Sequence, residues 1–122
     1  MTDDLYTSFR KLSPKVTGGL VRMREDTFKD ASKDASVPAK YKILASFVAV
    51  VVTKCEPCLR AYTKMAFQAG ATLDELVEFL NVAITEGGCL GKTWALKAFE
   101  TYKNLQTGQE VKEELCYKSE DN

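Results

Sequence analysis

A nearly continuous apolar segment places the strongest constraint on how this chain can fold. The ten residues from Ile43 to Val52 are all apolar except Ser46. The segment has about half of the ~20 residues that a transmembrane helix requires. Its valines would permit a buried strand. However, its length and the lack of a hairpin turn favour a helix that other elements enclose on all sides.

The residues before this segment predict a short lead-in followed by one amphipathic helix. Residues 1–12 are expected to hold a single helical turn around Leu5 and Phe9. Ser13 and Pro14 form a good helix start, because serine caps the first turn and proline is tolerated within it. The apolar residues that then recur at helical spacing, and that we expect to face inward, are Val16, Leu20, Met23 and Phe28.

Three further helices are predicted after the apolar segment. Pro57 lies where a helix begins, and Gly70 is a natural stop because glycine adopts the left-handed conformation without steric cost. Thr72 and Glu75 form a capping box for the next helix, which the glycine pair at 87–88 ends. A last helix is expected over residues 90–105. The pattern predicts an all-α chain of five to six helices.

Length and charge limit the number of domains and the classes of partner that this chain can have. A chain of 122 residues suits a single domain. We expect its core over about residues 14–106 and a flexible tail over residues 107–122. Basic and acidic residues both total 17, so the surface offers no electrostatic footprint for nucleic acid or an anionic membrane. The N-terminus lacks the apolar stretch of a secretory signal, and we expect a cytoplasmic protein with reduced thiols.

The absence of histidine excludes several kinds of catalytic site. The chain contains none, which rules out Ser-His-Asp triads, Cys-His nucleophile pairs, HExxH zinc sites and histidine general bases within it. Acid–base chemistry is therefore left to Asp, Glu, Lys, Tyr, Cys or bound water.

The sequence Cys55-Glu-Pro-Cys58 is the principal candidate site. Two cysteines three residues apart at a helix start lie on one face, close enough to form a disulfide with little backbone movement. The positive potential of the helix N-terminus, together with Lys54 and Arg60, favours the reactive thiolate. Pro57 stiffens the short ring. The motif suits a pair that cycles between dithiol and disulfide.

Two other interpretations of the cysteines stay open. A pair of this spacing can be half of a zinc site, but Cys89 and Cys116 are far apart and no histidine can complete one. We therefore expect neither a metal nor another cofactor. Alternatively, the pair consists of inert thiols packed as small hydrophobic side chains. We expect Cys89 itself to be buried and inert, and we assign Cys116 no role.

The segment from Val37 to Glu100 resembles the carboxymuconolactone decarboxylase superfamily and, within it, the alkylhydroperoxidase D-like branch. The resembling features are the entry Lys40-Tyr-Lys42, the apolar helix, the cysteine pair, Gln68-Ala-Gly-Ala-Thr72 before an acidic helix start, and Gly87-Gly88. The resemblance implies an all-α fold that assembles as a homotrimer or homohexamer. It also implies a dithiol that reduces small peroxides or exchanges disulfides with a thiol reductant protein.

The resemblance also implies a proton relay that this sequence lacks. In the redox branch a glutamate twelve residues before the first cysteine, and a histidine four after the second, usually serve the thiols. Here the two positions hold Ile43 and Tyr62. Ile43 cannot transfer a proton, whereas Tyr62 can donate a hydrogen bond one turn from Cys58, although a phenol of pKa ~10 is a poor base. We favour Cys58 as the attacked thiol with Cys55 resolving, while the helix dipole alone favours the reverse.

Two carboxylates are candidates to replace the missing acid. These are Glu86, before the glycine pair, and Glu56, inside the motif, although solvated surface carboxylates are more common. Tyr62 could equally serve only in packing. The missing relay supports a second hypothesis, a non-catalytic helical assembly or redox-sensing module. A lactone decarboxylase is less favoured, because that chemistry needs acid–base and anion-binding groups rather than a dithiol.

Overall fold

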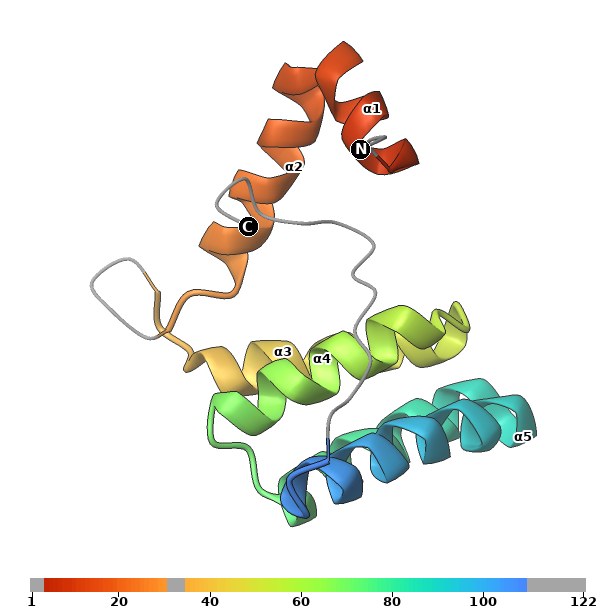
Figure 1. Cartoon of the computed structure of the whole chain (residues 1–122). Coiled ribbons are helices and arrows are strands. Elements are labelled where there is room, and N and C mark those ends of the chain that lie inside the picture. Colours follow the sequence, from red (N-terminus) through yellow and green to blue (C-terminus); the bar gives the residue numbers. More distant parts are fainter. Residues whose placement is uncertain (1–3, 31–34, 110–122) are drawn as a thin grey trace.

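The computed structural model describes residues 4–30 and 35–109, so most of the predicted tail, with Cys116, lies outside the described residues. The described residues form five helices: α1 (Leu5–Leu12), α2 (Pro14–Thr27), α3 (Ala39–Val52), α4 (Glu56–Gln68) and α5 (Leu73–Gln106) (Figure 1). The all-α prediction is confirmed. No helix in this part of the chain is long and apolar enough to cross a bilayer.

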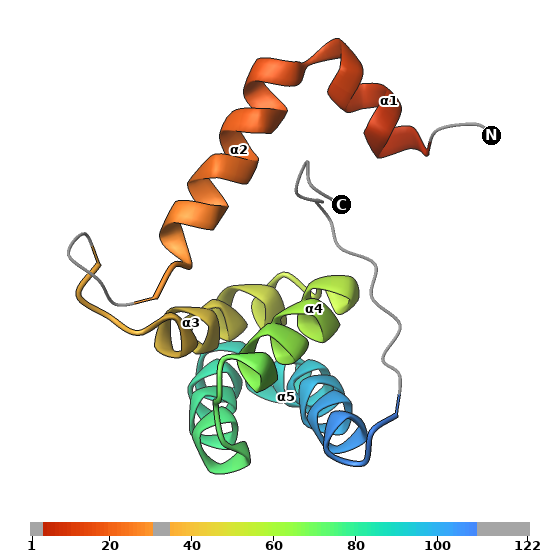
Figure 2. The ribbon, with the colours of Figure 1, turned by 60° about the vertical axis from the view of Figure 1, so that its left-hand side comes forward.

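The long helix α5 contains the break that the glycine pair predicts. Gly88 has φ 64° and ψ −149°, a conformation that is essentially restricted to glycine. The chain reverses there, and the two halves of α5, residues 73–87 and 89–106, lie side by side (Figure 2). Gly91 permits their close approach, because a Cβ atom at this position would lie 3.2 Å from the carbonyl oxygen of Ala83. Counted separately, the halves account for the sixth predicted helical segment.

The core forms where α3 and α4 pack on the two halves of α5 (Figure 1). Full burial of a large aliphatic or aromatic side chain stabilises a fold by about 1.5–3 kcal/mol relative to exposure. These contacts therefore fix α4 against its two neighbours. The largest fully buried side chains are Phe47, Leu44, Leu59, Leu76, Val51 and Thr63.

The apolar segment at residues 43–52 is helical as predicted, but it is not enclosed on all sides. Leu44 and Phe47 face the core, whereas Ala45, Ala49 and Val52 are exposed. Residues at spacings of three and four share one face of a helix, so α3 has an uncovered side. The prediction of full enclosure within the chain is wrong, because α4 and α5 cover only the core side of α3.

Polar contacts hold the start and the end of α5 in place. The predicted capping box is present: Glu75 N–H donates to Thr72 Oγ1 (3.1 Å), and Thr72 N–H donates to Glu75 Oε1 (2.9 Å). Lys40 Nζ lies 3.2 Å from Glu75 Oε2, which joins the starts of α3 and α5. Near the other end, the Tyr102 hydroxyl donates to the Ala71 carbonyl oxygen at 2.7 Å. These bonds tie both halves of α5 to the rest of the core.

The helices α1 and α2 form an arm that stands apart from the body of α3, α4 and α5 (Figures 1 and 2). α1 has eight residues, about two turns rather than the predicted one. Ser13 makes no side-chain capping bond to α2, so that expectation is wrong. Phe28 packs against the core as predicted, whereas Val16, Leu20 and Met23 are exposed. Their predicted inward orientation is wrong, because the arm leaves the body instead of lying on it.

Substitution of Gly91 by alanine is expected to destabilise the protein by about 1–2 kcal/mol, because the new methyl group presses on backbone atoms that cannot move independently. Gly87→Ala is the matched control. Its methyl group would lie at an ordinary 3.8 Å from Val52 Cγ2 and should gain up to about 1 kcal/mol of helix propensity. Urea unfolding of both variants measures the difference. Equal stability would contradict the close contact between the halves of α5.

Candidate functional site

A tight reversal between α3 and α4 sets the position of the cysteine pair. Cys55 N–H donates to the Val50 carbonyl oxygen (3.1 Å), and Lys54 N–H donates to that of Val51 (3.2 Å). These are the two hydrogen bonds of a Schellman motif. Lys54 takes the left-handed position with φ 58°, which costs a non-glycine residue roughly 1–2 kcal/mol. The same motif ends α4, where Gly70 holds that position with φ 85°.

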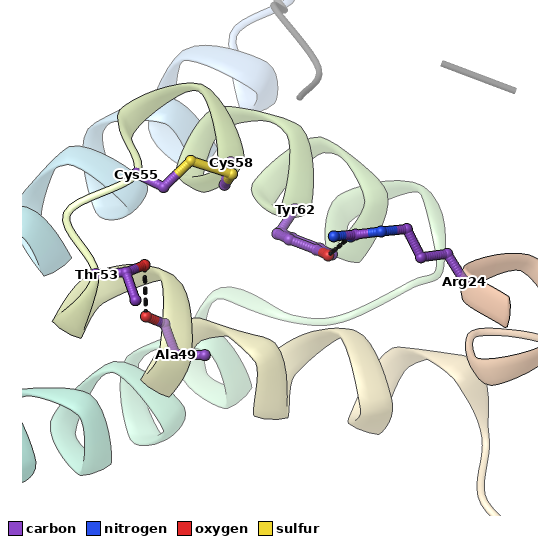
Figure 3. Close-up of a disulfide and its surroundings, with 6 residues drawn as sticks. All are labelled: Arg24, Ala49, Thr53, Cys55, Cys58 and Tyr62. Carbon is purple, nitrogen blue, oxygen red and sulfur yellow. Dashed lines mark hydrogen bonds between the residues drawn. A yellow bond between two sulfur atoms is a disulfide. The ribbon is translucent and has the colours of Figure 1, made fainter. Parts of the chain in front are cut away.

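Cys55 is the N-cap residue of α4, and a disulfide joins it to Cys58 in the first turn (Figure 3). Their Cα atoms are 5.2 Å apart, within the usual range for a disulfide. Pro57 occupies the first turn, as predicted. Both cysteines are half-buried. Cys58 packs against the core, and both residues keep part of their surface accessible to solvent.

Glu56, between the two cysteines, belongs to a cluster of ion pairs. Lys97 Nζ, from the second half of α5, lies 3.0 Å from Glu56 Oε1, and Arg60 Nη1 lies 3.5 Å from Oε2. The hydrogen bond from Lys97 and the charge of that residue hold the pKa of Glu56 below its ordinary value. The carboxylate is thus ionised at neutral pH. It is not a proton donor there, and its two basic partners offset its charge beside the sulfurs.

Tyr62 connects the disulfide helix to the arm. It follows Cys58 by one turn and is 8% exposed. Arg24 Nη1 donates to the Tyr62 hydroxyl at 3.0 Å, and the Phe28 ring lies 5.7 Å from the Tyr62 ring between centroids. In Figure 3 the phenol extends along α4, away from the disulfide and toward Arg24. The hydroxyl group is therefore paired with α2 rather than directed at the sulfurs.

The remaining candidates lie farther from the pair. Ile43, at the usual glutamate position, is 4% exposed within the core. Glu86 is exposed, and the described residues show no hydrogen bond or ion pair that joins it to the cysteines. A Cβ atom on Gly87 would lie 3.8 Å from Val52 Cγ2, so the break in α5 does approach the end of α3. Cys89 follows that break as an exposed free thiol, and the expectation that it is buried is wrong because this turn faces solvent.

Sequence reasoning missed Arg24 and Lys97, which contact the site from distant parts of the chain. Arg24 is separated from Tyr62 by 38 positions, and Lys97 from Glu56 by 41. No local pattern signals either contact, because each depends on how the helices pack. Within the described ranges, no group of three or more Cys, Asp or Glu side chains is arranged to hold a metal ion.

The fold and the site together define a class of helical protein with a disulfide at the start of an internal helix. Residues 14–101 match the model of the carboxymuconolactone decarboxylase family. The chain belongs to this family. The alkylhydroperoxidase D-like branch that the sequence resembles is consistent with this match.

Two individual proteins are similar to this chain. An uncharacterized protein from Cupriavidus necator is 32% identical over 112 residues, which are 86% of this chain and 98% of that protein. The crystal structure of an apo carboxymuconolactone decarboxylase family protein from Legionella pneumophila has a TM-score of 0.70 and 25% identity. That alignment covers 81% of this chain and 85% of the other.

Replacement of Lys54 by glycine is expected to stabilise the protein by about 0.5–1 kcal/mol. Glycine removes the steric cost of the left-handed conformation. Part of this gain is lost, because glycine also raises the conformational entropy of the unfolded chain. Lys54→Ala is the control, because it removes the same charge but keeps the Cβ atom. Urea unfolding with the disulfide intact measures both variants. If glycine and alanine were equally stable, Lys54 would not have the conformation described.

Removal of Lys97 is expected to raise the pKa of Glu56 toward its ordinary value of 4.5. In the wild type the folded-state pKa lies below the unfolded-state pKa. The stabilisation from this pair is therefore present above the unfolded-state value and is lost as pH falls through the folded-state value. NMR titration of the Glu56 carboxyl group in Lys97→Gln tests the shift. Lys92→Gln, a change at an exposed lysine of the same helix, should leave that pKa unchanged.

Proposed function

We propose that this protein is a dithiol oxidoreductase that uses Cys55 and Cys58 to reduce small peroxides or to exchange disulfides with a thiol partner. The half-buried disulfide at the N-terminus of α4 carries the proposal. Positive potential at a helix N-terminus favours the thiolate, and a thiolate is the species that attacks peroxides and disulfides. Membership of the carboxymuconolactone decarboxylase family is compatible with this chemistry.

The reaction begins from the reduced protein, with Cys58 as the attacking thiolate. An S–O bond forms to the terminal peroxide oxygen, the O–O bond breaks, and the departing alkoxide or hydroxide takes up a proton. The Cys55 thiolate then attacks the sulfenic acid on Cys58. The S–S bond forms as the S–O bond breaks, and the departing hydroxide takes up a proton from solvent to become water. The peroxide has gained two electrons from the cysteine pair. An external dithiol then reduces the Cys55–Cys58 disulfide by thiol–disulfide exchange.

The departing oxygen needs a proton source other than the usual relay. Ile43 has no titratable group, and Glu56 is held ionised by Lys97. Tyr62 accepts a hydrogen bond from Arg24, and arginine is only a donor, so the phenol retains its own proton. The hydroxyl points toward Arg24 and away from the disulfide (Figure 3), so we assign proton supply to solvent water. Two half-buried thiols that depend on solvent for protons should react more slowly than a pair with a complete relay.

We also propose that the working form is a homotrimer or homohexamer in the cytoplasm. That compartment contains the thiol reductant proteins that the cycle requires. Large exposed apolar side chains support assembly, because monomeric proteins seldom leave large contiguous apolar patches on their surface. Among the described residues they include Leu5, Leu12, Leu90 and Leu96.

One observation favours a second candidate, a redox-sensing or purely structural module. The buried apolar Ile43 replaces an acid that peroxide turnover normally uses. In a sensor the same disulfide would form slowly and change a surface instead of supporting turnover. The rate of disulfide formation therefore separates the two functions.

The test adds one equivalent of hydrogen peroxide to the fully reduced protein and counts free thiols over time. We expect the wild type to lose two thiols about tenfold faster than an ordinary cysteine reacts, since positive potential at a helix N-terminus increases the fraction of the reactive thiolate. A dithiol should restore both. Disulfide exchange is measured in parallel, with glutathione disulfide as the oxidant.

Single substitutions assign the roles in this reaction. Cys55→Ser should accumulate a sulfenic acid on Cys58 that dimedone traps, and Cys58→Ser should not. Cys89→Ser is the control, because it removes an exposed thiol outside the pair and should leave the fast phase unchanged. Uniform slow loss of thiols at all cysteines would refute the enzymatic proposal and favour the redox-sensing or structural module.

A further inference from the structure

The helix α1 presents an apolar stripe that the described part of the chain leaves uncovered. Leu5, Phe9 and Leu12 are 91%, 60% and 88% exposed. Their spacings of four and three place them on one face. An eight-residue helix is too short to be stable alone in water. α1 contacts α2, but its apolar stripe has no covering surface among the described residues.

A matching apolar groove lies between the two halves of α5. It has a volume of about 210 Å³. Leu96, on its rim, is 55% exposed, so the groove opens to solvent. Asn81 adds one amide to a lining that is otherwise apolar, formed by Val77, Leu80, Ile84, Ala95, Leu96 and Phe99.

We propose that α1 of one copy of this chain docks in the α5 groove of a second copy. The stripe of α1 has the i, i+4, i+7 spacing with which amphipathic helices anchor in apolar grooves. The dimensions agree as well. From Leu5 to Leu12 and from Val77 to Ile84 the helix advances by the same number of residues, which is about 10 Å at 1.5 Å per residue.

The charges of the two surfaces are complementary. Residues 4–27 contain five basic and three acidic side chains, whereas α5 contains five acidic and three basic ones. Arg10 and Lys11 lie on the side of α1 away from the stripe, and Glu78 and Glu100 follow groove residues directly in sequence. The complementarity is therefore one of net charge between the arm and α5, which favours their encounter.

The groove of the same chain is not within reach of α1. The arm carries α1 to the opposite side of the body, with α3 and α4 between it and α5 (Figures 1 and 2). A second copy therefore supplies the groove, and repetition of the contact closes a dimer or a ring. The arm also contacts Tyr62, one turn from Cys58, so the contact links the disulfide helix of one copy to α5 of the next. The inference rests on the proposed homo-oligomer and names the contact that forms it.

The direct test is disulfide trapping between two single variants, Phe9→Cys and Leu96→Cys. Both are made with Cys89→Ser and Cys116→Ser, and the Cys55–Cys58 disulfide is left oxidised. One variant carries an affinity tag. After mixing and mild oxidation, we expect a cross-linked heterodimer on a non-reducing gel, with the two engineered cysteines in the linked peptides. The matched control replaces Leu96→Cys by Val82→Cys, an exposed apolar site of α5 outside the groove, which should cross-link at least tenfold less.

Association is then measured by sedimentation and light scattering. Phe9→Glu and Leu96→Glu should each weaken self-association at least tenfold with unchanged helix content, and Val82→Glu should not. A monomeric wild type would overturn both the assembly and this contact. An oligomer that cross-links equally at positions 96 and 82, or that tolerates all three glutamates, would overturn the contact alone. These measurements use the oxidised protein, so their outcome is separate from peroxide reduction.

Discussion

The site depends on one backbone reversal, in which α3 ends and α4 begins within a few residues. Hydrogen bonds from Cys55 and Lys54 back to the last turn of α3 turn the chain sharply. The first turn of α4 then starts at Cys55 itself. A longer connection would separate the cysteines from the helix N-terminus and remove the positive potential that favours the thiolate. Lys54 adopts an unfavourable left-handed conformation in this turn. The turn that positions the disulfide therefore lowers the stability of the fold.

Around that reversal, ion pairs and hydrogen bonds occupy the residues at and near the relay positions that the resemblance to the alkylhydroperoxidase D-like branch implies. Lys97 and Arg60 neutralise the carboxylate of Glu56, which lies between the two cysteines in the sequence. Arg24 donates a hydrogen bond to the hydroxyl of Tyr62. Ile43 is buried in the core at the position where the resemblance implies a glutamate. The site therefore keeps the electrostatic means to form thiolates but has few means to deliver protons quickly. The proposed exchange of disulfides would need little proton transfer, because a thiolate attacks the disulfide and another thiolate leaves.

The body and the arm of the chain bury their apolar side chains to different degrees. α3, α4 and α5 bury a continuous core. The arm touches that body chiefly around Tyr62 and exposes apolar side chains along both of its helices. Since burial of each such side chain contributes about 1.5–3 kcal/mol, a second copy is the simplest source of the missing contacts. The arm would then tie the environment of Cys58 to the state of assembly.

Local signals in the sequence determined the helices and the cysteine pair, because each signal acts over one or two turns. Gly70, the Thr72–Glu75 box and Gly88 end or begin helices where predicted, and a spacing of three at a helix start brings Cys55 to Cys58. Helical periodicity also showed which side of each helix is apolar, but it could not show what covers that side. The exposure of Val16 and of Cys89 was therefore missed, as were the contacts of Arg24 and Lys97 with residues about 40 positions away. Only tertiary packing decided these, because such contacts depend on the relative placement of whole helices and not on any local preference.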